Sequence, residues 1–308
     1  MQEKSDSVKN PLETLEEKLN QSHLDPINHQ IIEGSGVNLW IKRDDQIHPI
    51  ISGNKWRKLK YILKHALDTG HDHLISMGGP WSNHLHALAW VGKELGLETT
   101  GIIRGEIPDK KSSTLKDIEK WGMQLEHVNR LEFRQLRAYR EPDSPPARRY
   151  QGYWIPEGGA TQLALKGVSE LVDEIHISFD VIVLACGTGT TLAGIASALP
   201  TNKHVVGFSA LKGAGFLYKE VNRVLESELK NWSINLDYHF GGFAKADQKL
   251  FSFMKDFEEQ TGILLDPVYT GKMMYGLFDL IRQGHFQPGT KIMAIHTGGL
   301  QGSSGFMN

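Results

Sequence analysis

The segment VIVLACGTGTTLAG, residues 181–194, decides the expected fold. Its first residues form an apolar, β-branched run typical of a buried parallel strand, a Gly/Thr turn follows, and a helix is expected from residue 190. Such a turn directs backbone N–H groups and a helix N-terminus toward an anion. An ordinary tight turn between a strand and a helix is the alternative interpretation. The candidate phosphate ligands are Gly187, Thr188, Gly189, Thr190 and Thr191.

The spacing of this turn argues against two common nucleotide motifs. No Gly-Lys-Ser/Thr follows it, so it is not a Walker A loop. The third glycine of G-x-G-x-x-G would fall on Leu192, and no acidic residue follows at the distance that a dinucleotide fold needs. A phosphate monoester therefore suits the turn better than a pyrophosphate, and a nucleotide-binding oxidoreductase is disfavoured.

Strand and helix patterns alternate along the rest of the chain. This alternation predicts an α/β fold with two open, twisted, mostly parallel sheets that carry helices on both faces. The segment REPDSPPARRY, residues 140–150, is expected to cross between units as a solvated loop, with a bridge over the active site as the alternative. Strands are expected at 37–42, 73–77, 99–104, 124–128, 181–185, 204–208 and 291–295, and helices at 55–67, 83–95, 114–121, 161–175, 190–199, 215–229, 247–260 and 272–282.

Composition narrows the class of protein. The chain has 308 residues, with 34 Lys and Arg against 36 Asp and Glu, and therefore no basic excess that would indicate nucleic acid or a membrane surface as a partner. A single cysteine, Cys186, excludes an internal disulfide and a multi-cysteine zinc site. The histidines show no zinc-binding spacing, so no metal is expected. The charged N-terminus lacks the apolar region of a secretory signal, and we expect a cytoplasmic protein.

A lysine stands at an unusual place in the segment SGNKWRKL, residues 52–59. Ser52 or Asn54 is expected to cap a helix, which places Lys55 in its first turn. A cation there opposes the helix dipole, and the same field lowers the amine pKa, as a lysine that forms a Schiff base requires. An ordinary surface lysine is the alternative.

Three further segments are candidate ligand sites, and two of them, residues 78–84 and 296–299, directly follow expected strands. The segment GGPWSNH, residues 78–84, precedes a helix whose free N–H groups, with Ser82 and Asn83, suit a carboxylate. Ser82 is also a candidate nucleophile or proton donor, although a plain N-cap explains it equally. The segments DPVYTGK (266–272) and HTGG (296–299) each form a turn on their own, but loops at strand carboxyl ends converge on a ligand in open α/β sheets.

Together these segments resemble the pyridoxal-phosphate-dependent family of D-cysteine desulfhydrase and 1-aminocyclopropane-1-carboxylate (ACC) deaminase, which has the tryptophan-synthase-β-like fold. The resemblance runs from about residue 10 to residue 307. It is carried, in order, by IKRDD (41–45), SGNKWRKL (52–59), SNH (82–84), CGTGTT (186–191), DPVYTGK (266–272) and HTGG (296–299). It implies a pyridoxal 5′-phosphate cofactor, a homodimer, and two domains, a larger one of residues 1–52 with 159–308 and an inserted one of residues 53–158.

The resemblance also implies roles for individual residues. Lys55 would hold the cofactor covalently and later take the Cα proton of the substrate. Ser82 and Tyr269 would join it as catalytic residues, with Tyr269 reaching the reacting carbons. Thr270 would face the pyridine nitrogen. The cofactor would also meet Asn54, Asn83, Thr297 and the turn at 187–191, and the substrate would meet Trp81, Ser82, Asn83, His84, Phe243 and Tyr269.

Two positions favour a desulfhydrase over an ACC deaminase. ACC deaminases resemble this chain but carry Glu after the tyrosine, where Thr270 stands, and a second tyrosine where Phe243 stands. The expected reaction is β-elimination of D-cysteine, or of a similar small D-amino acid, to pyruvate, ammonia and sulfide. ACC ring opening to 2-oxobutanoate and ammonia is the alternative, and a non-catalytic protein that binds the cofactor or an amino acid is a second. Trp81 stands where desulfhydrases usually have glutamine. The segment 140–150 also departs from the family pattern.

Overall fold

Two β-sheets, each flanked by helices, organise the structure, a computed structural model that describes residues 10–225 and 227–301. The larger sheet has the order β1-β2-β10-β7-β8-β9, in which β1 is antiparallel to β2 and the other neighbours are parallel. Its strands are β1 (Leu24–Pro26), β2 (Asn38–Lys42), β7 (Val181–Cys186), β8 (His204–Ser209), β9 (Trp232–Asn235) and β10 (Lys291–Ile295).

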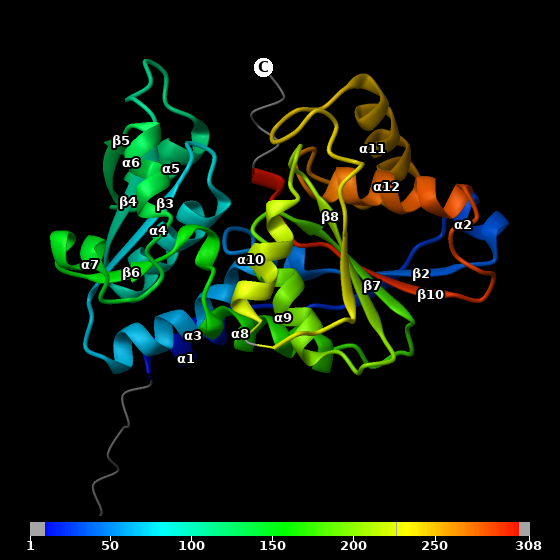
Figure 1. Ribbon diagram of the computed structural model, residues 1–308, viewed down its shortest axis with the longest axis horizontal. Coiled ribbons are helices and arrows are strands. Elements are labelled where there is room, and N and C mark those ends of the chain that lie inside the picture. Colours follow the sequence, from blue (N-terminus) through cyan, green and yellow to red (C-terminus); the bar gives the residue numbers. More distant parts are fainter. Residues whose placement is uncertain (1–9, 226, 302–308) are drawn as a thin grey trace, which may run out of the picture.

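The smaller sheet is parallel throughout, in the order β5-β4-β3-β6. The chain leaves the larger sheet after β2, builds the smaller sheet, and returns at β7, so the two sheets stand side by side in Figure 1. Its strands are β3 (His73–Gly78), β4 (Glu98–Arg104), β5 (Gln124–Val128) and β6 (Tyr153–Ile155). The expected α/β class with two mostly parallel sheets is confirmed. The domain limits at 52/53 and 158/159 stay a prediction, and residues 1–9 and 302–308 of the larger unit lie outside the described part.

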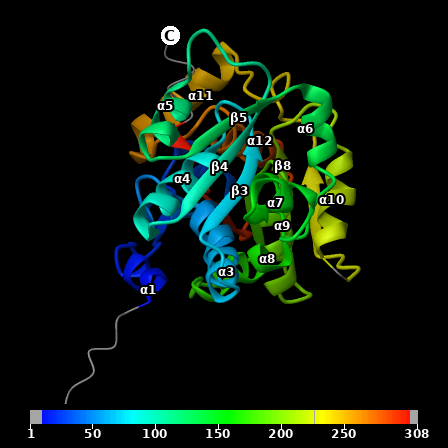
Figure 2. The ribbon, with the colours of Figure 1, turned by 90° about the vertical axis from the view of Figure 1, so that its left-hand side faces the viewer.

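Helices cover the sheet faces (Figures 1 and 2). All six residues of β7 are buried, as its continuous apolar run predicts for a strand covered on both faces. Apolar clusters on either side of the larger sheet bury Leu184 and Val183, neighbours that point to opposite faces. The helices are α1 (Pro11–Glu16), α2 (Gln30–Ser35), α3 (Asn54–Asp68), α4 (Asn83–Leu95), α5 (Ser113–Lys120), α6 (Arg130–Leu136), α7 (Pro145–Tyr150), α8 (Gln162–Asp173), α9 (Thr190–Ala198), α10 (Phe216–Val224), α11 (Gln248–Thr261) and α12 (Thr270–Arg282), with 3₁₀ turns η1 (Asp44–Gln46) and η2 (Glu157–Gly159).

The start of α3 differs from the expected cap. Gly53, not Ser52 or Asn54, is the N-cap residue, and no side chain caps the helix. Gly53 has φ +61°, and a Cβ atom there would lie 2.0 Å from the carbonyl oxygen of Thr297. Only glycine lets the two backbones approach this closely, and the approach sets the N-terminus of α3 beside the end of β10.

The segment 140–150 is not the solvated loop expected from its sequence. Residues 145–150 form α7, which begins with two prolines and buries Pro146 and Ala147. Proline at the first helical positions costs no hydrogen bond, so the prolines that suggested a loop start a helix instead. Arg140 pairs with Glu220 of α10 at 3.5 Å, so this segment does contact the unit that holds the larger sheet.

Candidate active site

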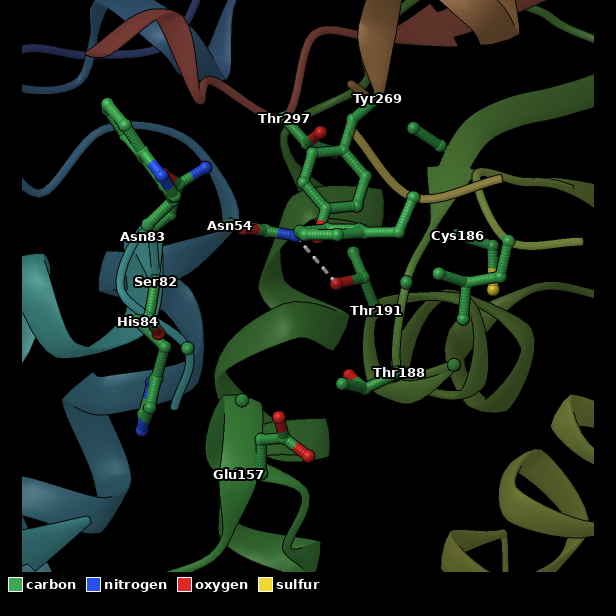
Figure 3. A pocket seen from close by; sticks show the side chains of 18 of the residues that line it. Asn54, Ser82, Asn83, His84, Glu157, Cys186, Thr188, Thr191, Tyr269 and Thr297 are labelled. Carbon is green, nitrogen blue, oxygen red and sulfur yellow. Dashed lines mark hydrogen bonds between the residues drawn. The ribbon is translucent and has the colours of Figure 1, made fainter. Parts of the chain in front are cut away.

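A cavity of about 670 Å³ lies between the two sheets, at the carboxyl ends of β3, β7 and β10. Figure 3 shows side chains from both units meeting in it. The structure brings together most of the residues predicted from the sequence: Asn54, Lys55, Trp81, Ser82, Asn83, His84, Gly187, Thr188, Gly189, Thr191, Phe243, Tyr269 and Thr297 all line the cavity. Two predicted residues, Thr190 and Thr270, do not.

Two lysines one helical turn apart face the cavity from α3. Lys55 donates a hydrogen bond from Nζ to Asn54 Oδ1 at 2.5 Å, and burial lowers its pKa to about 8 against the opposing effect of Asp266. Lys58 has a pKa lowered to about 7, first by burial and then by the charge of Lys55. Neither ammonium has a carboxylate within ion-pair distance among residues 10–225 and 227–301. The cavity therefore holds two amines whose pKa values lie near neutral pH and that have no ion-pair partner in the described part of the chain.

A largely buried ion-pair network fixes the helix that carries both lysines. The Arg57 guanidinium donates two hydrogen bonds to Asp44, at 2.6 and 2.9 Å, and two to Glu174, the residue that follows α8, at 2.7 and 2.8 Å. Lys42 also belongs to the network, with its Nζ atom 2.7 Å from Glu174 Oε2. Arg57 is 4% exposed and Asp44 is fully buried. Because the guanidinium holds each carboxylate through two hydrogen bonds, these contacts fix the orientation of α3 as well as its position.

The Gly/Thr turn forms a cradle at the start of α9. Gly189 is the N-cap residue with φ +82°, and no side chain caps the helix, so its first N–H groups remain available. Asn54 donates from Nδ2 to Thr191 Oγ1 at 2.9 Å, which ties α3 to the turn (Figure 3). Thr190 is fully buried beneath the cradle, with its hydroxyl 3.1 Å from that of Thr188. The turn suits a phosphate group, as the sequence predicted.

The loop after β3 brings polar groups to the opposite wall. Ser82 caps α4 by accepting a hydrogen bond from the Leu85 N–H at 3.2 Å, the structural role foreseen as its alternative, and it also lines the cavity. Asn83 Oδ1 is buried and has no hydrogen-bond partner within the described residues. An unpaired buried acceptor in a cavity indicates that a ligand completes the arrangement.

His84 is held as a neutral ring. Ser76 donates its hydroxyl proton to the carbonyl of Ile155 at 2.8 Å, so its oxygen accepts from His84 Nε2 at 2.8 Å. Burial, followed by the charges of Lys55 and Lys58, lowers the pKa of His84 to about 3. The ring therefore serves as a polar, uncharged part of the wall.

Tyr269 reaches the cavity from a turn that Asp266 builds. The Asp266 carboxylate accepts hydrogen bonds from the N–H groups of Val268, Tyr269 and Thr270 at 2.8–2.9 Å and from the Thr270 hydroxyl at 2.8 Å. The Tyr269 ring lies against Gly187, whose hypothetical Cβ atom would stand 3.1 Å from Tyr269 Cε1. Burial raises the pKa of Tyr269, so the phenol keeps its proton. Thr270, expected at the pyridine nitrogen, points instead into this turn.

Some residues at the site were not foreseen from the sequence. Lys58 looks like a surface lysine in the sequence, and only its spacing of three from Lys55 on one helix could have placed it on the same face. Glu157 lines the cavity but pairs with Arg137 through hydrogen bonds of 2.6 and 3.1 Å. Cys186 is buried, and burial raises its thiol pKa to about 12, in keeping with the packing role expected for it.

Two kinds of feature are absent from the described residues. Among them, no group of three or more His, Cys, Asp or Glu side chains could hold a metal ion. No helix in the described part of the chain is long and apolar enough to cross a membrane.

Comparison with known proteins agrees with this geometry. Residues 26–298 match the family model described as pyridoxal-phosphate dependent enzyme. The chain belongs to the pyridoxal-phosphate-dependent enzymes. It is 34% identical to a putative ACC deaminase of Pyrococcus horikoshii over 284 residues, which cover 87% of this chain and 86% of that protein.

Two further relatives support the same family. A bifunctional D-cysteine desulfhydrase/ACC deaminase of Arabidopsis thaliana, a mitochondrial protein, is 31% identical over 312 residues, covering 90% of this chain and 76% of that one. A crystal structure described as an ACC deaminase homologue superimposes with a TM-score of 0.74, at 30% identity and 96% coverage of each chain. The chain is therefore an enzyme of the ACC deaminase and D-cysteine desulfhydrase family.

The residues of the cavity fit pyridoxal phosphate. The group needs an amine, an anion cradle and polar contacts for its ring, and these are supplied by Lys55, the turn at 187–191 with Lys58, and Asn54, Asn83 and Thr297. Asn83 Oδ1 and the Lys58 amine, neither of them paired within the described residues, are both positions that a bound polar ligand would complete. The volume of about 670 Å³ is of the size that holds a cofactor together with a small substrate.

Proposed function

We propose that this enzyme eliminates a β-leaving group from a small D-amino acid, with D-cysteine as the model substrate and pyruvate, ammonia and sulfide as products. The choice of this reaction rests on the tyrosine and carboxylate groups that line the cavity. Among the described residues that line the cavity, Tyr269 is the only tyrosine and Glu157 the only carboxylate, and Glu157 is bound by Arg137. The site thus offers one phenol and no free carboxylate.

Several residues are proposed to hold the cofactor. Lys55 binds it through Nζ, which a pKa of about 8 makes available as a neutral amine. The N–H groups at the start of α9 and the Lys58 ammonium bind its phosphate. Asn54 and Thr297 contact its ring, and Thr297 replaces Thr270 as the hydroxyl nearest that ring, because only Thr297 lines the cavity. When bound, the cofactor supplies an electron sink for the carbanion formed at Cα.

The remaining wall is proposed to bind the substrate. The Ser82 hydroxyl and the Asn83 side chain bind its carboxylate beside the start of α4, where the helix N-terminus also favours an anion. The space for the substrate side chain is limited by Trp81, His84 and Phe243. The freed Lys55 amine takes the Cα proton, since its pKa lies close to neutral pH. The Tyr269 phenol keeps its proton and can donate it to a leaving sulfur at Cβ.

Ring opening of ACC is the competing function, named in the relatives above. It starts from a substrate without a Cα proton and was expected to require a carboxylate at position 270 and a phenol at position 243. Thr270 is bound to Asp266 outside the cavity, and Phe243 packs edge-on against Tyr269 with ring centroids 6.1 Å apart. Neither position supplies the group that ring opening was expected to need.

The test is a product assay on the holoenzyme. D-cysteine, L-cysteine and ACC are supplied separately, and sulfide, pyruvate and 2-oxobutanoate are measured, with Lys55→Ala as the inactive control. We expect sulfide and pyruvate from D-cysteine alone. If 2-oxobutanoate from ACC forms faster than pyruvate from D-cysteine, the proposed function is wrong. The enzyme is further proposed to be a cytoplasmic homodimer that binds no nucleic acid or membrane, and light scattering tests the dimer.

A further inference from the structure

A second cavity, of about 370 Å³, opens beside the active-site cleft and is lined almost entirely by arginine. Arg104 comes from the end of β4, and the other arginines come from α6 and the residue after it. Arg104 and Arg137 line both cavities, so the second one adjoins the mouth of the first. The full lining is Arg104, Arg130, Phe133, Arg134 and Arg137.

A buried aromatic ring gathers two of these guanidinium groups. Phe133 is 2% exposed, and the Cζ atoms of Arg104 and Arg137 lie 5.8 and 5.2 Å from its ring centroid. Stacking on one ring holds two cations near each other that would otherwise separate in water. The two hydrogen bonds to Glu157 further fix Arg137.

Most of the positive charge of this cavity has no acidic partner in the described part of the chain, Arg137 with Glu157 being the exception. Within residues 10–225 and 227–301, Arg104, Arg130 and Arg134 have no carboxylate at ion-pair distance, which leaves three cations without a partner. The acidic residues of the adjoining strand and helix, Glu126 and Glu132, both bind Arg149 instead. The chain as a whole carries a net charge of −2, so a general excess of basic residues does not explain the cluster.

We propose that this cavity binds a small phosphate-bearing anion with two or more negative charges. Guanidinium forks match phosphate oxygens in pairs, and several forks around one cavity favour a multivalent ligand over a single carboxylate. The volume of about 370 Å³ admits a pyrophosphate or the phosphate ester of a small metabolite. The site is separate from the cradle at the start of α9, where the cofactor phosphate is placed.

Calorimetric titration of the holoenzyme with inorganic pyrophosphate tests the site, with cofactor absorbance followed in parallel. We expect saturable binding of one pyrophosphate per chain while the cofactor stays bound. In the double variant Arg130→Gln/Arg134→Gln, binding should weaken at least about tenfold, because two charge-assisted contacts are lost. These two arginines line only the second cavity, so turnover should remain that of the wild type.

Two comparisons make the titration decisive. The control Arg148→Gln/Arg282→Gln removes the same charge from exposed positions outside both cavities, and its affinity should stay within about twofold of the wild type. Arg130→Lys/Arg134→Lys keeps the charge but not the forks, and its affinity should fall between those of the wild type and the glutamine variant. No saturable heat, equal weakening in the glutamine and control variants, or cofactor release during titration would each overturn the proposal.

Discussion

The Thr270 hydroxyl donates a hydrogen bond to Asp266 Oδ1 at 2.8 Å and accepts one from the Asp266 backbone N–H at 2.9 Å. Both of its hydrogen-bonding roles are thus used inside the turn that orients Tyr269. Among the described residues, Thr297 of the neighbouring loop lines the cavity, whereas Thr270 does not. The two threonines therefore have different expected effects when replaced by valine.

Thr270→Val should lower the free energy of unfolding by about 1–3 kcal/mol, because it removes one of the four hydrogen bonds to the buried Asp266 carboxylate and leaves the Asp266 backbone N–H without its partner. The absorbance of the bound cofactor should not change. Thr297→Val should alter that absorbance with little loss of stability. Urea unfolding and absorbance spectra of both variants check this, and a spectral change in Thr270→Val as large as that in Thr297→Val would contradict it.

Tyr269→Phe should slow turnover of D-cysteine by about 10²–10⁴-fold, because the variant loses the phenol proposed to donate a proton. Its unfolding should stay close to that of the wild type, since no residue in the described ranges is hydrogen-bonded to the Tyr269 hydroxyl. Tyr275→Phe, in the helix α12 that begins directly after Tyr269 but outside the cavity, is the matched control and should keep wild-type turnover. Steady-state kinetics decide the matter, and equal rates for the two variants would exclude Tyr269 from the chemistry.

Arg57→Gln should destabilise the protein by about 3–5 kcal/mol, because it leaves the buried Asp44 carboxylate without its main partner. Arg149→Gln also breaks two ion pairs, but on the surface, and should cost less than about 1 kcal/mol. Thermal or urea unfolding compares the two. Similar losses of unfolding free energy in the two variants would mean that the ion-pair network around α3 contributes no more stability than an exposed ion pair.

The pKa of Lys55 predicts how fast the cofactor-free protein captures pyridoxal phosphate. Only the neutral amine attacks an aldehyde, and with a pKa of about 8 its fraction rises about tenfold from pH 6 to pH 7 and levels off above pH 8. The capture rate should follow the same curve in stopped-flow absorbance. A rate that keeps rising to pH 10, as for an ordinary lysine, would show that burial does not lower this pKa.

Long, periodic elements could be predicted from the sequence, whereas short ones could not. The strand Lys291–Ile295 and the helix Asn83–Leu95 agree with their expected limits, because each buries enough residues for its period to be seen. Three-residue strands such as Tyr153–Ile155 carry too little pattern. The helix Pro145–Tyr150 was missed because its two prolines are equally typical of a loop.

The candidate site was predictable where it follows strand ends, because parallel strands bring their carboxyl ends to one edge. Lys58 and the arginine cavity escaped prediction for a different reason. A lysine or arginine in a sequence usually lies in solvent, and only the fold shows that Lys58 is 4% exposed beside Lys55. The side-chain direction of Thr270 likewise depends on Asp266, a contact that spacing alone does not specify.

The chemistry proposed here depends on Lys55, and not Lys58, binding the cofactor. Borohydride reduction of the holoenzyme makes the lysine–cofactor bond permanent, and peptide mass mapping then locates it. We predict a single pyridoxyl group on Lys55, and none in Lys55→Ala treated in the same way. A pyridoxyl group on Lys58, or a reduced holoenzyme with no modified lysine, would contradict the proposed active site.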